Sequence, residues 1–382
     1  MQSKTKASPV KGTTLPAYEA VRAAFEDNLS SGLEPGGHFA VYRDGDAIVD
    51  LWGGHMGRDT NLRIQEDSLY TIFSATKGVF ATAVAMLVNR GKLHYDDRVS
   101  SHWPEFGQNG KDHLTVGQAM SHQVGLAAFH KPITMTDLYD HDAAASTLAA
   151  QKPDFAPGVW AYHALASGVI ADEIIRRVDG RTFKQFFRDE LAPRLGNDLL
   201  IGLPEDEDDR HVGLEIPSGA GGVAYDPPMP AMFELTMTNP PTDLDWANWR
   251  VFREAGIPSA GGSANARGLA KMYAAIVSDT APLLSRAVFK EATCQRVSGV
   301  DQGSGGIGRY AAGYRMNVGD MGASPDAFGH PGIGGTIGFG DPARHIGVAY
   351  TSSRAGSPDW QRPDPRLIKL LVAFYKADAA AR

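Results

Sequence analysis

The feature that most constrains the fold is the order of strand-like and helix-like segments along the chain. Residues 36–54 are rich in strand-forming residues and contain Asp44-Gly45, a dipeptide typical of hairpin turns. Residues 336–353 form a second strand-rich segment, with Asp341-Pro342 at its turn. The segments between them are mostly helical in pattern. The sequence therefore predicts an α+β fold, in which an antiparallel sheet built from both chain ends is flanked by helices.

The same order predicts the domain organisation. We expect residues 14–72 and 300–382 to form one α/β domain that contains the antiparallel sheet, and residues 73–299 to form an inserted, mainly helical domain. Residues 1–13 are expected to be a disordered tail. An active site would lie at the junction of the two domains.

Composition limits the classes of partner. The net charge of −7 leaves no broad basic surface, so we expect no nucleic-acid binding and favour a small-molecule partner. The longest apolar run, Gly78 to Val88, is too short to cross a membrane, and the N-terminus lacks the apolar core of a secretory signal. We therefore expect a cytoplasmic protein that is not bound to a membrane. The sequence leaves the oligomeric state open.

No metal or cofactor is expected. Cys294 is the only cysteine, which excludes an intrachain disulfide and a thiolate metal cluster, and no H-E-x-x-H pair is present. The segment Gly303–Gly308, "GSGGIG", has the spacing of a dinucleotide fingerprint, but a strand-like segment follows it where a helix is required. We interpret it as a flexible loop.

The first candidate for chemistry is the pair Ser74 and Lys77. The apolar run that begins at Val79 places Ser74 at the N-terminus of a buried helix, where free N–H groups stabilise negative charge. Residues i and i+3 share a helix face, and burial lowers the pKa of a lysine, so Lys77 could act as a base towards Ser74. On these residues alone, a capping serine beside a snorkelling lysine is the favoured interpretation, because capping serines are common. The same S-x-x-K spacing also occurs twice in the tail, at Ser3 with Lys6 and at Ser8 with Lys11.

Several ordered segments make a family resemblance specific. They are Ser74-Ala75-Thr76-Lys77, "LTVGQAMSHQVGL", "APGVWAYHALASGVIADEIIRRVDG", "IGLPEDEDDRHV" and "IPSAGGSANARGLAKMYAAI". Together they resemble the serine β-lactamase and penicillin-binding-protein superfamily, and within it the class C β-lactamases and the family VIII carboxylesterases. The resemblance runs from the first hairpin to the last helix and implies a β-lactamase-like fold.

The resemblance also implies roles for individual residues. Ser74 would be the nucleophile, and Lys77 with Tyr162 would share its proton, with the formal base left open between the two. The third motif of the family aligns with "HPGIGG", which places His330, Pro331 and Gly332 at the positions usually held by Lys-Thr-Gly. The backbone N–H groups of Ser74 and Ile333 are the candidate oxyanion hole.

Two departures from the family pattern bear on the substrate. Class C enzymes carry Tyr-x-Asn, whereas this chain has Ala164 at the asparagine position and His163 between. His163 would line the pocket or simply pack. His330 would donate to Tyr162 or to the substrate, but it clamps a β-lactam carboxylate less reliably than lysine does. The expected substrate-binding residues are His163, His330 and Gly332.

These inferences predict a serine carboxylesterase that hydrolyses short- to medium-chain esters through an acyl-enzyme intermediate. Weak β-lactam hydrolysis is a second activity compatible with this site. The partner would be a small-molecule ester. Alternatives of related chemistry are a β-lactamase, a D-amino acid peptidase or an acyltransferase. A non-catalytic binding protein with a lost site is a more distant alternative.

Overall fold

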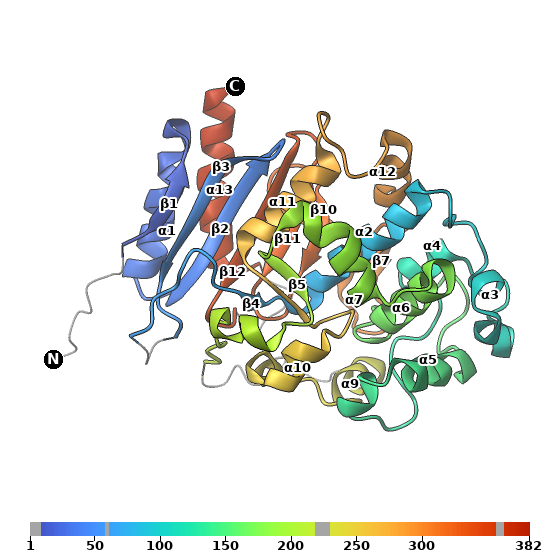
Figure 1. The fold of residues 1–382 in the computed structure, drawn as a ribbon. Coiled ribbons are helices and arrows are strands. Elements are labelled where there is room, and N and C mark those ends of the chain that lie inside the picture. The colour runs from blue at the N-terminus through green and yellow to red at the C-terminus, as the bar shows by residue number, and fades with distance from the viewer. Residues whose placement is uncertain (1–8, 58–60, 218–229, 357–362) are drawn as a thin grey trace.

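The fold is described by a computed structural model that covers residues 9–57, 61–217, 230–356 and 363–382 (Figure 1). Most of the predicted N-terminal tail, residues 1–8, lies outside the described residues. Residues 11–13, which were also assigned to that tail, instead belong to a strand, β1 (Lys11–Thr14), which pairs with β3.

The main sheet joins the two chain ends. In the described part of the chain it has the strand order β1-β3-β2-β12-β11-β10-β9-β8-β7, and all its pairings are antiparallel. The strands after β1 are β2 (Gly36–Arg43), β3 (Asp46–Gly54), β7 (Val297–Val300), β8 (Ile307–Tyr310), β9 (Arg315–Met316), β10 (Phe328–Pro331), β11 (Ile337–Asp341) and β12 (Ile346–Ser352). Because β12 pairs with β2, the centre of the sheet joins residues that are more than 300 positions apart in the sequence.

Helices cover both faces of this sheet (Figure 1). On one face lie α1 (Glu19–Ser30) and α13 (Pro365–Ala381), whose apolar side chains share a core with alternate residues of the central strands. On the other face α11 (Ala266–Val277) packs against β2, β11 and β12. Gly347 permits this approach, because a Cβ there would lie 2.0 Å from the carbonyl oxygen of Ala270.

The helical region is built around α2 (Thr76–Asn89), which is buried along nearly its whole length. The other α-helices are α3 (Val99–His102), α4 (Val116–Met120), α5 (His141–Ala150), α6 (Ala166–Asp179), α7 (Phe183–Phe186), α8 (Ala192–Leu195), α9 (Ala231–Thr238), α10 (Arg250–Ala255) and α12 (Arg286–Thr293). A small antiparallel sheet has the order β4 (Tyr70–Thr71), β6 (Gly262–Ala264), β5 (Leu199–Ile201).

Short helical turns complete the chain. They are η1 (Pro16–Tyr18), η2 (Phe73–Ala75), η3 (Pro104–Gly110), η4 (Thr136–Leu138), the π-helical η5 (Phe187–Leu191), η6 (Glu205–Arg210) and η7 (Leu244–Asn248).

The predicted domain boundaries do not follow the packing at every point. Helix α11 falls within the segment assigned to the helical domain, yet it packs on the main sheet, and β7 begins at Val297, before the boundary at residue 300. The sequence pattern showed a helix at α11 but not which element it covers. The division into two domains remains a prediction.

Candidate active site

Ser74 lies where the small sheet passes into the buried helix α2. Strand β4 ends at Thr71, and the single turn η2 carries Ser74 directly into α2. Phe73 has a φ of 43°, a left-handed conformation that costs a non-glycine residue about 1–3 kcal/mol. Phe73 is buried, at 2% exposed. The turn leaves the Ser74 side chain half-buried at the head of the helix.

Lys77 is fully buried and its amine faces Ser74. Its Nζ donates to Ser74 Oγ at 3.2 Å, to the carbonyl oxygen of Ala164 at 2.6 Å and to that of Ser259 at 3.1 Å. No carboxylate is among these partners, and burial lowers the pKa of Lys77 to about 7. A substantial fraction of this amine is therefore neutral near pH 7 and can accept a proton from Ser74.

Tyr162 approaches the same oxygen from another segment. Its hydroxyl donates to Ser74 Oγ at 3.1 Å, and its ring centroid lies 5.2 Å from the Lys77 Nζ. Burial raises the pKa of Tyr162, and this effect outweighs the hydrogen bond to Ser74 and the charge of Arg315, which lower it. Burial therefore keeps Tyr162 a phenol, contrary to the expectation that a neighbouring ammonium would favour the phenolate.

The third predicted motif lies at the end of β10. The His330 ring is 2% exposed and stacks near Tyr162, with ring centroids 6.0 Å apart. Its Nδ1 lies 2.7 Å from the carbonyl oxygen of Pro331. Since a carbonyl only accepts, Nδ1 carries the hydrogen and Nε2 is left as an acceptor.

The protonation state of His330 therefore differs from the prediction that this side chain donates a hydrogen bond to Tyr162 or to the substrate. Burial holds the pKa of His330 well below its usual value, so the ring is neutral. Its Nε2 is buried and makes no hydrogen bond with the described residues. In this state the ring has no hydrogen with which to donate to Tyr162 or to a substrate.

Gly332 brings the chain after β10 onto the Ser74 turn. A Cβ at Gly332 would lie 2.3 Å from the carbonyl oxygen of Ile72, a separation that no side chain tolerates. The backbone N–H of Gly332 donates to the carbonyl oxygen of Thr336 at 2.6 Å. This hydrogen bond closes a tight turn that contains Ile333. The backbone of Ile333 therefore follows directly on a residue in contact with the Ser74 turn.

His163 is buried and forms hydrogen bonds with neighbouring segments of the chain. Its Nε2 accepts from the backbone N–H of Leu126 at 3.0 Å, and the backbone N–H of His163 donates to His122 Nδ1 at 3.2 Å. The ring is 1% exposed, and burial lowers its pKa to about 3. Of the two readings left open by the sequence, these contacts favour packing.

Sequence reasoning missed several groups around the three central side chains. The carbonyl of Ser259, the ring of His122 and the carboxylate of Asp301 all contact Lys77, Tyr162 or their backbone. A backbone carbonyl leaves no signature in the sequence. Asp301 lies two residues before the glycine-rich "GSGGIG", and that position was the one available signal.

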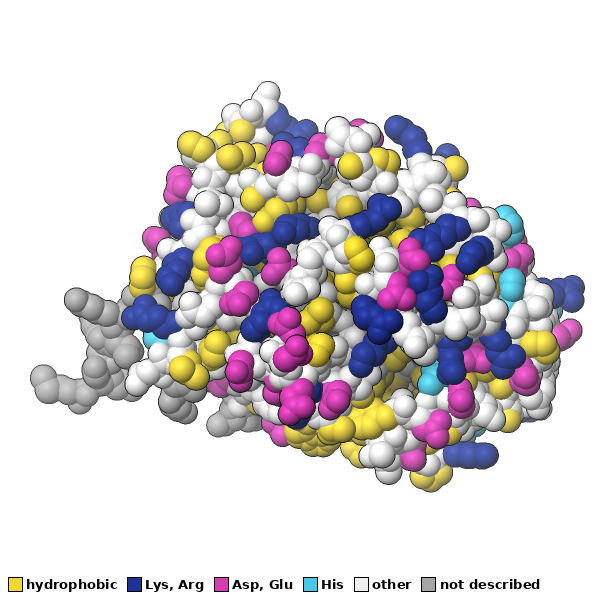
Figure 2. All heavy atoms as spheres, in the orientation of Figure 1, with side chains coloured by type: hydrophobic (Ala, Val, Ile, Leu, Met, Phe, Trp, Pro, Cys, Tyr) yellow, Lys and Arg dark blue, Asp and Glu magenta, His cyan; other side chains and the backbone are white. Residues whose placement is uncertain are grey.

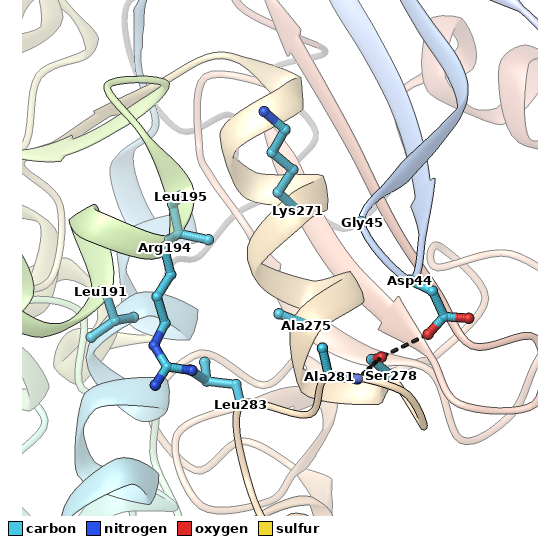
Figure 3. A pocket seen from close by; sticks show the side chains of 10 residues that line it. All are labelled: Asp44, Gly45, Leu191, Arg194, Leu195, Lys271, Ala275, Ser278, Ala281 and Leu283. Atoms are coloured by element: carbon cyan, nitrogen blue, oxygen red, sulfur yellow. Dashed lines mark hydrogen bonds between the residues drawn. The ribbon is translucent and has the colours of Figure 1, made fainter.

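A separate cavity of about 360 Å³ lies away from these residues (Figure 3). It is bordered by the tip of the β2–β3 hairpin, by α8 and by the end of α11, and Arg194 extends across it towards Leu283. Ser74, Lys77 and Tyr162 are not among its lining residues. It is therefore not the predicted site.

Other features bear on metals, membranes and partners. Among the described residues, no group of three or more His, Cys, Asp or Glu side chains is arranged to hold a metal ion. None of the described helices is long and apolar enough to cross a membrane. On the face shown in Figure 2, basic and acidic side chains are interspersed rather than gathered into a basic surface.

An antiparallel sheet with helices on both faces, and a serine–lysine–tyrosine cluster beside its β10 strand, is the arrangement of β-lactamase-type proteins. Residues 21–373 match the sequence model of the Beta-lactamase family, and the chain belongs to that family. The predicted β-lactamase-like α+β fold is thereby confirmed.

Individual relatives narrow the position within the family. The chain is 34% identical to Esterase/beta-lactamase LipL of Mycobacterium tuberculosis, over 98% of this chain and 90% of that protein. The crystal structure of a family VIII carboxylesterase superposes with a TM-score of 0.90 at 35% identity, over 96% of this chain and 99% of the other. EstA from Arthrobacter nitroguajacolicus Rue61a superposes with a TM-score of 0.88 at 29% identity, over 98% of this chain and all (100%) of the other. These similarities confirm the predicted resemblance to family VIII carboxylesterases.

Proposed function

We propose that the chain is a serine carboxylesterase that works through an acyl-enzyme intermediate. The observation that carries this proposal is the convergence of Lys77 Nζ and Tyr162 Oη on one atom, Ser74 Oγ, at 3.2 and 3.1 Å. A serine becomes a nucleophile when a base removes its proton. A capping serine beside a snorkelling lysine would instead leave the amine in solvent, whereas the Lys77 side chain is 0% exposed.

In the first half-reaction, Ser74 Oγ attacks the ester carbonyl carbon and its proton passes to the neutral amine of Lys77. The carbonyl oxygen becomes an oxyanion, which the N–H groups of Ser74 and Ile333 would stabilise. When the carbon–oxygen bond to the alcohol breaks, the leaving alkoxide takes the proton back from Lys77 through the Tyr162 hydroxyl. The acyl group remains on Ser74.

In the second half-reaction, water attacks the acyl carbon and gives a proton to the same pair, Lys77 and Tyr162. The bond between the acyl carbon and Ser74 Oγ then breaks, and Ser74 regains its proton. This step releases the carboxylic acid and restores the site. Because Tyr162 is held as a phenol, it is suited to relay protons, while Lys77 is the group that accepts them.

Two positions support an ester rather than a lactam as the main substrate. Ala164 offers no side-chain amide where class C enzymes have an asparagine, and His330 is neutral where they have a lysine. The third-motif position therefore supplies no cation to clamp the carboxylate of a β-lactam. The relative named Esterase/beta-lactamase supports weak β-lactam hydrolysis as a second activity.

A substrate panel tests the proposal. We expect the wild type to hydrolyse p-nitrophenyl acetate and butyrate faster than nitrocefin, and Ser74→Ala to lose both activities. A fluorophosphonate probe should label the wild type and not this variant. Nitrocefin turnover that rivals the esters would favour the β-lactamase alternative, and absence of labelling would favour the non-catalytic one. Cytoplasmic residence and a preference for short to medium acyl chains stay predictions.

A further inference from the structure

The glycine-rich loop between β7 and β8 contacts the segment that carries Tyr162. This segment, residues 159–163, contains no helix or strand, and α6 begins only at Ala166. No backbone ladder therefore fixes Tyr162, and its position depends on the hydrogen bonds that neighbouring segments supply.

Asp301 provides the central contact from this loop. Its Oδ1 accepts from the backbone N–H of Tyr162 at 3.1 Å and from that of Gly303 at 2.8 Å. Its Oδ2 accepts from the hydroxyl of Ser304 at 2.5 Å. The side chain is 4% exposed, so a buried carboxylate joins the loop to the backbone of Tyr162. A buried charge of this kind is tolerated because hydrogen bonds satisfy its oxygens.

Further contacts fix the loop and the segment to each other. The backbone N–H of Gln302 donates to the carbonyl oxygen of Trp160 at 3.2 Å. Gly308 lies so close to the Trp160 ring that a Cβ would come within 2.7 Å of it. The carbonyl oxygen of His122 also accepts from the N–H of Ala161 at 3.1 Å. The segment is therefore held both by His122 and by the Asp301 loop.

We propose that Asp301 is a positioning residue, which holds the backbone of Tyr162 so that the phenol meets Ser74 Oγ. The inference rests on the proposed serine hydrolase chemistry. Asp301 itself touches neither Ser74 nor Lys77 among its hydrogen-bond partners. Its effect on the reaction therefore passes through Tyr162, and it should vanish when the Tyr162 hydroxyl is removed.

A double-mutant cycle tests this dependence. The variants are Asp301→Ala, Tyr162→Phe and their combination, measured by kcat and KM for p-nitrophenyl butyrate and by the rate of fluorophosphonate labelling. We expect Asp301→Ala to lower kcat by about tenfold or more with KM within about threefold, since general acid–base groups contribute about 10²–10⁴-fold. In the Tyr162→Phe background, the same substitution should change kcat by less than about threefold.

Asp341 offers a matched control. It is also buried, at 0% exposed, accepts from the backbone N–H two residues on, Ala343, at 3.0 Å, and accepts from the hydroxyl of Ser324 at 2.7 Å. It lies at the far end of β11 from the residue that pairs with Pro331. Asp341→Ala should lower the Tm while the folded protein keeps its kcat.

Two further variants keep the test decisive. Asp301→Asn keeps an oxygen that can accept from the backbone N–H of Tyr162, so this variant should retain most of the wild-type kcat. If Asp301→Ala does not fold, Asp301→Ser replaces it in the cycle, because a hydroxyl can still accept from the loop amides but is too short to reach Tyr162.

An equal loss of kcat in both backgrounds, or no loss in either, would overturn the positioning role. A wild type that is inactive on esters but labelled in an Asp301-dependent way would contradict the ester substrate and leave the positioning role standing. A wild type that is neither active nor labelled would contradict both proposals.

Discussion

The Nζ of Lys77 lies 3.2 Å from the Oγ of Ser74, one helical turn away on the same face of the chain. The amine is fully buried and donates to two backbone carbonyl oxygens rather than to a carboxylate. Burial without a compensating negative charge is what brings its pKa down to about 7.

The rate of acylation should follow the protonation of Lys77. Because the neutral amine is the active form, kcat/KM for p-nitrophenyl butyrate should rise with pH and level off above a midpoint at about 7. The measurement is a pH profile of kcat/KM in buffers of constant ionic strength. A midpoint near the ordinary lysine value would show that Lys77 is not the base.

Burial of Lys77 should also cost stability. Its folded pKa is depressed, so the unfolded chain binds more protons between about pH 7 and 10.5, and stability rises with pH across that window. Lys77→Met removes this cost and should raise the Tm near neutral pH by about 2–4 °C while abolishing esterase activity. A lower Tm would mean that the three hydrogen bonds of the amine outweigh its desolvation.

Removal of the Tyr162 hydroxyl should slow proton transfer without weakening binding. Tyr162→Phe is expected to lower kcat by about 100-fold and to leave KM within a few-fold, because general acid–base catalysis contributes on that scale. The midpoint near pH 7 should remain in this variant, since it belongs to Lys77. Steady-state kinetics at several pH values would check both statements, and loss of the midpoint would assign it to Tyr162 instead.

Gly332 should tolerate no side chain. In Gly332→Ala the new Cβ would meet the carbonyl oxygen of Ile72 at 2.3 Å, and the turn that carries Ile333 must move away from Ser74. We expect kcat/KM to fall by about tenfold or more, because one oxyanion donor contributes about 10²–10³-fold. Fluorophosphonate labelling should slow in parallel. Unchanged labelling would remove Ile333 from the proposed oxyanion hole.

His141 should make stability depend on pH far from the site. Burial lowers its pKa, but hydrogen bonds with Asp172 and Glu173 outweigh burial and raise the pKa to about 9. The stabilisation is therefore complete below about pH 6.5 and is lost as the pH rises through about 9. The Tm difference between wild type and His141→Gln should be largest at low pH and should disappear above pH 9. A difference that is constant with pH would contradict a charged His141.

The strands that pair the two chain ends could be predicted because their hairpins carry clear turn residues. Strands β4, β5 and β6 could not, since runs of two or three residues have no readable alternation. The helical pattern of α11 was visible, but its packing on the sheet depends on Gly347, which lies far along the sequence.

The central side chains of the site could be predicted because Ser74 heads an apolar helix and Tyr162 lies in a family-like segment. The state of His330 could not, because its tautomer is set by one backbone carbonyl, that of Pro331. Asp301 was missed for a similar reason, since it acts on the backbone of Tyr162 rather than on a side chain.

The central claim is that Ser74 Oγ carries the acyl group. Intact-protein mass spectrometry after rapid acid quench of the p-nitrophenyl butyrate reaction, followed by peptide mapping, tests it directly. We predict one butyryl group per chain, located on the peptide that contains Ser74 and absent from Ser74→Ala. An acyl group on another residue, or full esterase activity in Ser74→Ala, would contradict this account.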